Sequence, residues 1–416
     1  MERVHRNAEG KAIPISTVAK MGIIVAALGY FVDIYDLVLF SIVRVRSLQS
    51  LGFTQEELLP KGAFLLNVQM TGLLLGGILW GVLGDKIGRV KVLFGSILLY
   101  SLANIANGFA PNIELYALAR FCAGIGLAGE LGAGITLVSE SMSTTHRGYG
   151  TTIVATVGVL GAIVAGLVSD LTDWRTSYFV GGGLGLLLLA LRIGVYESGL
   201  FEQMRGSEAR RGDIRLLFSS KERLIRYLCC ILSGAPVWYV VGIFITFAPE
   251  FAKALALPEM PTASRAVLWC YVGLTGGDLA SGVLSQMIQS RRTTIRIFLT
   301  ILSAGVVAYL NLFGASLFAF YAVCVWIGFG VGYWAVFVSS AAEHFGTNLR
   351  ATVTTTVPNF VRGLVVPFTT LFQFLNPRIG TLQSGAVGIA IAIVVAFVSL
   401  SRLEESYGKD LVFLEE

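Results

Sequence analysis

The stretch GVLGDKIGRVK, residues 81–91, decides how the chain is interpreted, because a related stretch, GVLSQMIQSRR, occurs at residues 282–292. Both begin with Gly-Val-Leu, both end in basic residues, and each lies between two long apolar segments. Gly81 and Gly88 permit a tight turn and a close backbone approach, whereas the second copy has a glutamine in the position of Asp85. A loop repeated at matching places predicts a chain built from two duplicated halves.

The segments around these loops are poor in charge. Of 416 residues, 55% are hydrophobic and 14% are charged, and the mean hydropathy is +0.74; an ordinary soluble domain has about 25% charged residues. Apolar runs of about 20 residues match the thickness of a bilayer, and twelve such runs occur. They are 21–43, 63–83, 92–109, 112–138, 149–169, 177–195, 225–248, 264–288, 295–313, 315–340, 351–375 and 382–401. The sequence predicts an all-α membrane protein with twelve transmembrane helices in two six-helix bundles.

A basic hydrophilic insertion at mid-chain separates the two sets of six segments. It carries seven Lys or Arg residues when Arg226 is included. We therefore expect a cytoplasmic tail (1–20), a first bundle (21–195), a cytoplasmic linker (196–224), a second bundle (225–401) and a cytoplasmic C-terminal tail (402–416).

The distribution of Lys and Arg predicts the orientation. With the amino terminus inside, the inner segments carry 21 of these residues and the outer loops carry 7, as the positive-inside rule requires. We expect both termini in the cytoplasm and the protein in the inner or plasma membrane. The first 20 residues lack a small-residue cleavage site, so no removable signal peptide is expected. The net charge of +5 then reports topology, and nucleic-acid binding is not expected.

The first loop resembles the signature of the major facilitator superfamily, Gly-x-Leu-(small)-Asp-(Arg/Lys)-x-Gly-Arg-(Arg/Lys). The matching positions are Gly81, Leu83, Gly84, Asp85, Lys86, Gly88 and Arg89, and Lys91 comes one place late. The resemblance implies two helix bundles that rock around a central site. It also implies a conformational latch that breaks as they rock, formed by Gly81, Asp85, Gly88, Arg89 and Lys91.

A second resemblance points to the metabolite:proton and aromatic-acid:proton symporters. In LARFCAGIGLAGELGAGITLVSE, residues 118–140, the matching positions are Arg120, Gly124, Gly129 and Glu130, while Ala128 replaces a usual glycine. Asp33 and Asp36 fall on the two acidic positions of the first-helix element. VGVLGAIVAGLVSD, residues 157–170, lacks the Gly-Pro element of drug antiporters, which argues against an exporter.

Six ionisable residues stand well inside the expected spans: Asp33, Asp36, Arg120, Glu130, Asp278 and Arg362. Each costs about 2.5–3.5 kcal/mol on insertion scales, and such residues usually face the bundle interior. Asp33 and Asp36 share one helix face, and two like charges so close disfavour joint ionisation. We expect proton coupling through Asp33, Asp36, Glu130 or Asp278. The alternative is that Asp36 pairs permanently with an arginine.

The candidate substrate-binding residues combine cations with aromatic rings. They are Arg120, Arg362, Asn359, Tyr30, Trp238, Tyr239 and Trp334. A guanidinium matches a carboxylate through two parallel donors; the alternatives are that Arg120 is a structural partner and that Arg362 snorkels to the interface. Four carboxylates against two arginines leave an excess of two negative charges, which protons or a cation must balance.

These features predict a secondary active transporter that carries a small organic anion or zwitterion with a proton by alternating access. The alternative is a proton antiporter that exports a cationic or amphipathic solute. The three histidines and five cysteines show no catalytic or metal-binding spacing, so we expect no enzyme activity, no cofactor and no metal. The expected partners are a small-molecule substrate, a proton and the lipid bilayer, and the expected state is a monomer.

Overall fold

The computed structural model describes residues 15–87, 89–130, 147–197 and 217–409. Within those ranges every long regular element is a helix, and each expected span coincides with one helix or with a run of consecutive helices. The fourth expected span, 112–138, is described only as far as residue 130. The predicted all-α fold with twelve spans is confirmed.

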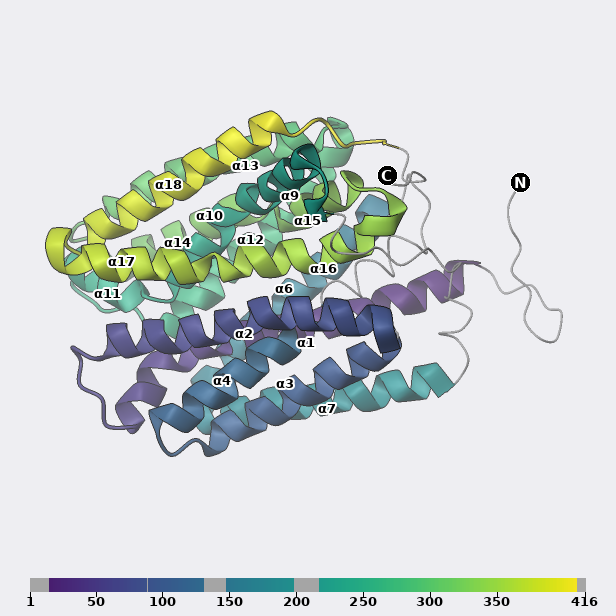
Figure 1. Ribbon diagram of the computed structural model, residues 1–416. Helices are drawn as coiled ribbons and strands as arrows, with labels where there is room; N and C mark the ends of the chain where they lie inside the picture. Colours follow the sequence, from purple (N-terminus) through teal and green to yellow (C-terminus); the bar gives the residue numbers. More distant parts are fainter. Residues whose placement is uncertain (1–14, 88, 131–146, 198–216, 410–416) are drawn as a thin grey trace.

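The helices described before residue 198 lie mostly in the lower part of Figure 1. They are α1 (Ile15–Ser50), α2 (Leu58–Ile87), α3 (Arg89–Phe109), α4 (Ile113–Leu127), α6 (Arg147–Leu171) and α7 (Trp174–Glu197). Helix α1 packs against α6 and α7, and α2 and α3 both pack against α4. Segments at membrane depth are helical because their backbone polar groups must be satisfied internally, and they are apolar because the bilayer core surrounds them.

The helices described after residue 216 lie mostly in the upper part of Figure 1. They are α9 (Lys221–Ser233), α10 (Ala235–Tyr239), the π-helix η2 (Val240–Ile245), α11 (Ala248–Ala254), α12 (Ala263–Met287), α13 (Arg291–Leu310), α14 (Leu317–Val331), α15 (Trp334–Glu343), α16 (Thr347–Gly363), α17 (Val365–Ile379) and α18 (Thr381–Arg402). The two groups meet where α6 contacts α12 and where α2 contacts α16 and α17. The boundaries of the expected linker, 196–224, stay a prediction, since residues 198–216 lie outside the described ranges.

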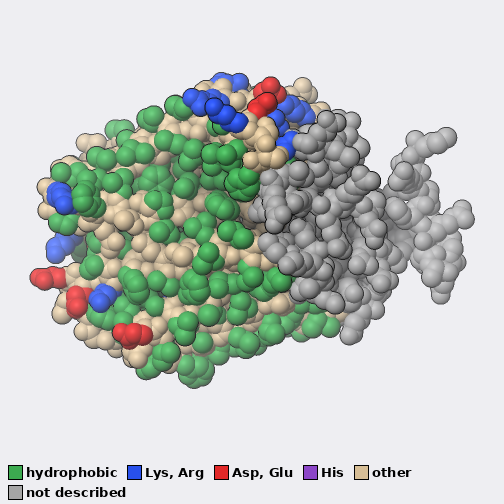
Figure 2. Space-filling model, in the orientation of Figure 1, with side chains coloured by type: hydrophobic (Ala, Val, Ile, Leu, Met, Phe, Trp, Pro, Cys, Tyr) green, Lys and Arg blue, Asp and Glu red, His purple; other side chains and the backbone are tan. Residues whose placement is uncertain are grey.

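The surface is that of a multi-pass membrane protein. Over the described residues, eight helices or runs of joined helices are long and apolar enough to cross a bilayer. Figure 2 shows apolar side chains over the middle of one face, with charged side chains gathered at its left end and at its upper right. On the described part of this face, exposed charge is thus concentrated toward the two ends, where a bilayer would give way to water.

Three of the expected spans are broken, which the apolar pattern did not indicate. Pro236 follows the break between α9 and α10, Gly332 lies between α14 and α15, and Leu364 separates α16 from α17. Interrupted helices at membrane depth are tolerated where the freed backbone groups line a cavity or meet other protein groups. All three breaks lie in the second half, and they surround the site described next.

The break after α14 lies where α12 packs closely against the end of α14. A side chain on Gly277 would place its Cβ 2.9 Å from the Cα of Gly332, so only glycine permits this approach. The contact brings the following residue, Asp278, to the first turn of α15.

Candidate functional site

A buried ion pair joins the two halves at mid-membrane. Arg362 Nη2 on α16 lies 3.3 Å from Asp33 Oδ2 on α1, and both side chains are fully buried. The structure thus brings together one predicted substrate-binding residue and one predicted proton-coupling residue. Among the described residues, Arg362 Nε, Arg362 Nη1 and Asp33 Oδ1 have no hydrogen-bond partner. Buried polar groups without partners are rare in folded proteins, so these atoms are available to a ligand.

Aromatic side chains surround the pair. The Arg362 guanidinium carbon lies 5.5 Å from the centre of the Trp238 ring, and Trp238 meets Trp334 edge-on with ring centres 6.4 Å apart. Tyr30 lies beside Trp334, in the field of Asp33 and Arg362. The two Arg362 nitrogens that have no partner among the described residues are donors suited to an anion.

Tyr239 does not belong to this cluster. Its hydroxyl donates to the carbonyl of Gly385 on α18 at 2.9 Å, and its ring packs against Phe244 and Phe368. The structure therefore turns Tyr239 into the packing of the second half, while its neighbour Trp238 faces Arg362.

Asn359 lies one turn before Arg362 on α16 and ties the halves together. Its Nδ2 donates to the carbonyl of Ala128 in the first half at 2.8 Å and to that of Thr355 at 3.0 Å. Its Oδ1 is buried and has no donor among the described residues. Asn359 Oδ1 is thus placed to accept a hydrogen bond from a solute bound to Arg362.

A second charged cluster lies wholly within the first half. Arg120 Nη1 on α4 donates to the Tyr178 hydroxyl on α7 at 2.9 Å, and the guanidinium lies over the Phe40 and Tyr178 rings. The positive charge of Arg120 acts on the Asp36 carboxylate. Among the described residues, neither oxygen of that carboxylate has a hydrogen-bond partner. Arg120 therefore meets a carboxylate of α1 electrostatically, and the structure does not pair it with Glu130.

Glu130 has a different partner, which the sequence did not indicate. Arg192 Nη1 on α7 lies 3.0 Å from Glu130 Oε2, and Nη2 contacts Oε1 of the same carboxylate. Both side chains are almost fully buried. Arg192 stands near the end of an expected span, where an arginine ordinarily reaches for the interface, so its buried pairing had no signal in the sequence.

Asp278 occupies the position of a helix cap. Its Oδ1 accepts a hydrogen bond from the backbone N–H of Ala335 in the first turn of α15 at 3.1 Å. A carboxylate is stabilised at a helix N-terminus by the unsatisfied N–H groups and the helix dipole. This contact gives Asp278 a structural role beside any part in proton coupling.

At one end of the molecule the two halves are held shut by a contact the sequence analysis missed. Arg44 Nη2 on α1 lies 2.7 Å from Glu250 Oε1 on α11 and donates to the Thr246 carbonyl at 3.1 Å. Beside it the Thr246 hydroxyl donates to that of Ser41 at 2.8 Å. Arg44 is fully buried. We call this set of contacts the Arg44 closure.

The predicted latch falls on residues whose contacts the structure does not describe. Gly88 lies outside the described residues, as do the surroundings of Gly81 and the side chains of Asp85, Arg89 and Lys91. Its role stays a prediction.

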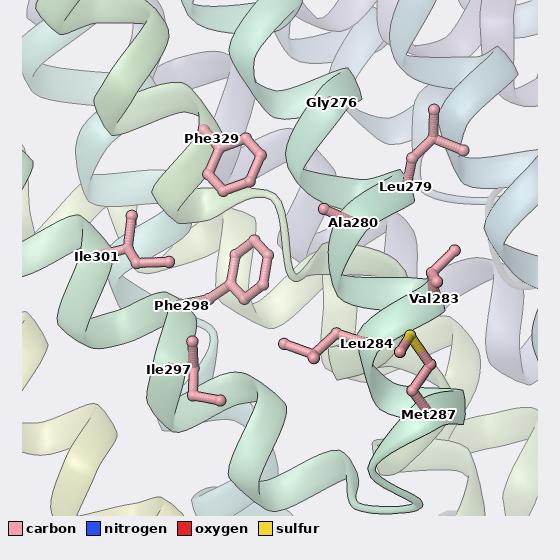
Figure 3. A pocket seen from close by; sticks show the side chains of 10 residues that line it. All are labelled: Gly276, Leu279, Ala280, Val283, Leu284, Met287, Ile297, Phe298, Ile301 and Phe329. Carbon is pink, nitrogen blue, oxygen red and sulfur yellow. The ribbon is translucent and has the colours of Figure 1, made fainter.

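A surface groove between α12, α13 and α14 has the wrong lining for this chemistry. Figure 3 shows only hydrocarbon side chains and one thioether around it, and Leu279, Val283 and Met287 are exposed to the surroundings. In a membrane such a groove faces lipid tails, so the buried polar clusters are the candidate site.

Two helix groups that enclose buried ion pairs at membrane depth define a transport protein, and comparisons with known proteins agree. The chain belongs to the Major Facilitator Superfamily, whose model matches residues 26–369. The "Probable 4-methylmuconolactone transporter" of Cupriavidus pinatubonensis is 25% identical over 401 residues, with 91% of this chain and 89% of that protein covered. The 3-(3-hydroxy-phenyl)propionate transporter of Escherichia coli is 26% identical over 366 residues, with 82% and 84% covered.

A solved structure shows the same fold. The proton:xylose symporter XylE bound to a bromodeoxyglucose superimposes with a TM-score of 0.71 at 15% identity, over 96% of this chain and 98% of that one. The protein is therefore a membrane transporter of small metabolites and not an enzyme.

Proposed function

We propose that the protein is a proton-coupled symporter for a small organic acid with a flat apolar body. The observation that carries the proposal is the Asp33–Arg362 pair, which spans the two halves and leaves two guanidinium nitrogens unused. Those nitrogens can hold a carboxylate through a pair of charge-assisted hydrogen bonds.

Competition for Arg362 supplies the coupling. When the substrate carboxylate takes Arg362, Asp33 loses its cation and becomes a buried, uncompensated charge. Such a charge costs several kcal/mol, so Asp33 takes up a proton. Substrate and proton are then carried together, and the empty carrier returns with the ion pair restored.

The aromatic lining and the relatives support a ring-bearing acid. Trp238, Trp334 and Tyr30 offer flat apolar faces beside Arg362, and the two relatives described above are named for a lactone acid and a phenylpropionate. Stacking on such rings favours a planar solute.

The charge balance of the buried residues supports a cation antiporter less than the sequence analysis suggested. The count of two excess negative charges omitted Arg192, which pairs with Glu130, and Asp278 is partly neutralised by the N-terminus of α15. The remaining acids, Asp33 and Asp36, face Arg362 and Arg120 one to one. A site balanced in this way has less need of a bound cation.

The finer topology belongs to the same proposal. We place both termini in the cytoplasm of an inner or plasma membrane, with the Arg44 closure on the opposite side and the latch of residues 81–91 on the cytoplasmic side. Alternating access then means that one closure forms as the other breaks, which follows from the rigid-body rocking of such halves.

Purified protein in liposomes that contain a pH dye, with the membrane potential clamped, tests the proposal. 3-(3-Hydroxyphenyl)propionate and 4-methylmuconolactone are added outside, with protein-free liposomes as the control for passive leak. Acidification of the lumen above that control is expected, and Asp33→Asn should abolish it. Alkalinisation on addition of pooled amines, with no response to the acids, would establish antiport and overturn the proposal.

A further inference from the structure

A chain of buried hydroxyl groups leads away from the Arg120 cluster inside the first half. Tyr178 OH accepts from Arg120 and lies 2.8 Å from Tyr116 OH. Tyr116 OH donates to Ser47 Oγ at 3.4 Å, and Ser47 Oγ donates to the carbonyl of Arg44 at 3.0 Å. All of these side chains are buried to within a few per cent.

The chain runs from the surroundings of Asp36 to the end of the molecule that the Arg44 closure holds shut. At its inner end a Cβ on Gly181, one turn after Tyr178 on α7, would press on Asp36 Oδ1 and the Tyr35 ring, so Asp36 lies against this part of α7. At its outer end Ser47 is one turn from the exposed Ser50, whose hydroxyl donates to the Ser47 carbonyl at 2.9 Å.

We propose that Ser47, Tyr116 and Tyr178 form a proton path that loads Asp36 from the side of the Arg44 closure while the substrate route on that side stays shut. This inference rests on the proposed proton coupling. It adds a route for the proton that is separate from the route of the substrate, because the path lies within one half and the substrate site lies between the halves.

Each hydroxyl can donate one hydrogen bond and accept others. A chain of hydroxyls can therefore pass a proton along without any of them keeping it. One proton enters from water at Ser47, each hydroxyl passes its own proton inward, and one proton leaves Tyr178 for the carboxylate of Asp36. The transfer leaves the Tyr116 and Ser47 hydroxyls pointing outward, as seen here, and they rotate inward before the next proton enters. Asp36 passes the proton to Asp33, three residues away on the same helix face, once the substrate has freed Asp33 from Arg362.

The groups that face Asp36 offer a proton bound there one route toward the substrate site. The charged and titratable neighbours are Arg120 from α4, Asp33 and Tyr35 from α1, Tyr100 from α3 and Tyr178 from α7, and Asn104 of α3 adds an amide. Only Asp33 among them is held by a residue of the second half. A proton on Asp36 can return along the path, but it reaches the substrate site only when Arg362 changes partner.

Ring contacts brace this part of the bundle in addition to the hydroxyl groups, of which that of Tyr178 also accepts from Arg120. The Tyr116, Tyr178 and Trp174 rings already pack edge-on or tilted against one another, with centres 5.7–6.3 Å apart. Tyr35 shows the contrasting case, since its hydroxyl donates to the backbone carbonyl of Ser177 at 3.0 Å and continues to no further hydroxyl of the described chain.

Infrared spectroscopy of the full-length protein in lipid films tests the path without a substrate. The carboxylic acid band that disappears in Asp36→Asn is assigned to Asp36, and its shift is followed after H₂O buffer is exchanged for D₂O over a series of acidic to neutral conditions. Tyr116→Phe and Tyr178→Phe keep the ring packing, and each is expected to slow the shift about tenfold or more. Tyr35→Phe and Tyr309→Phe, whose hydroxyls bond only backbone carbonyls, should exchange at the wild-type rate.

Three results would overturn the path: wild-type exchange in both path variants, equal slowing in Tyr35→Phe, or no band assignable to Asp36 under any condition. Transport gives a second readout in the liposomes described above. The path variants should lose proton influx driven by 3-(3-hydroxyphenyl)propionate about tenfold while its equilibrium exchange stays within about twofold; parallel loss of both would indicate a structural role. If the wild type moves no protons with either acid, the symport proposal fails, and the infrared result still decides the path.

Discussion

Breaking the Asp33–Arg362 pair from one side should destabilise the protein more than removing both charges. The two side chains are fully buried at 3.3 Å, and deleting one partner of a buried pair costs about 3–5 kcal/mol because the other charge is left uncompensated. If one helix bundle unfolds as a unit of about 200 residues, that loss corresponds to a fall of roughly 6–20 °C in Tm. Arg362→Gln and Asp33→Asn should each show a fall of this size.

The double variant, Asp33→Asn with Arg362→Gln, carries two neutral amides and no buried charge. It should recover most of the loss, because replacing both partners of a buried pair is often nearly neutral. Thermal unfolding of the purified protein in detergent, followed by the fluorescence of its six tryptophans, measures all four proteins. The non-additivity of the two changes is the coupling energy.

The chain offers a matched control. Arg265 and Asp170 also join the two halves, but at 3.9 Å and with side chains 62% and 37% exposed. An exposed pair contributes about 0–1 kcal/mol, so Arg265→Gln should leave Tm nearly unchanged. Single variants at the central pair that unfold with the wild type, or a double variant that shows the sum of both losses, would refute the reasoning.

Three further predictions concern contacts outside this pair. Arg44→Gln removes the 2.7 Å contact with Glu250 and should speed backbone hydrogen exchange in α11; unchanged exchange would show that the closure does not depend on this pair. Asp278→Asn keeps an oxygen for the Ala335 N–H, so proton-driven uptake should stay within about threefold of the wild type, and its complete loss would identify Asp278 as a proton carrier. Burial alone would raise the pKa of Glu405, but hydrogen bonds from Ser290 and from backbone N–H groups lower it below its usual range. The stability this gives is present above a pH of about 4.3 and lost as the pH falls through the lower pKa of the folded state. The wild type should therefore lose Tm more steeply than Glu405→Gln in that acidic range, and parallel curves would contradict this.

The sequence was sufficient for the fold because a bilayer imposes length and polarity directly on each segment. Prolines indicate bends in two of the three broken spans, but the third break depends on contacts between segments. The interruption at Gly332 has no proline to announce it; it follows from the approach of Gly277 on α12 and from the cap that Asp278 provides.

The sequence indicated which ionisable residues lie inside the spans, but it left most of their pairings open. Position along a span fixes the depth of Asp33 or Arg362 in the membrane, but which carboxylate meets which arginine depends on the rotation and packing of whole helices. Trp238 and Tyr239 illustrate the limit, since successive residues of a helix point about 100° apart and only one can face the cavity. Arg44 and Arg192 stand near span ends, where interfacial arginines are ordinary, so no sequence pattern indicated that they are buried.

The separation of the two charged clusters constrains the order of events in transport. Asp36 and Arg120 belong to one half, so rocking of the halves leaves their geometry unchanged, whereas Asp33 and Arg362 belong to different halves and must move relative to each other. Of these two pairs, only Asp33–Arg362 can therefore change its geometry with the direction in which the carrier faces. In the proposed cycle, a proton held at Asp36 takes part in transport when it reaches Asp33, and substrate at Arg362 allows it to do so. The proposed coupling requires no contact between proton and substrate, because both compete through a single ion pair.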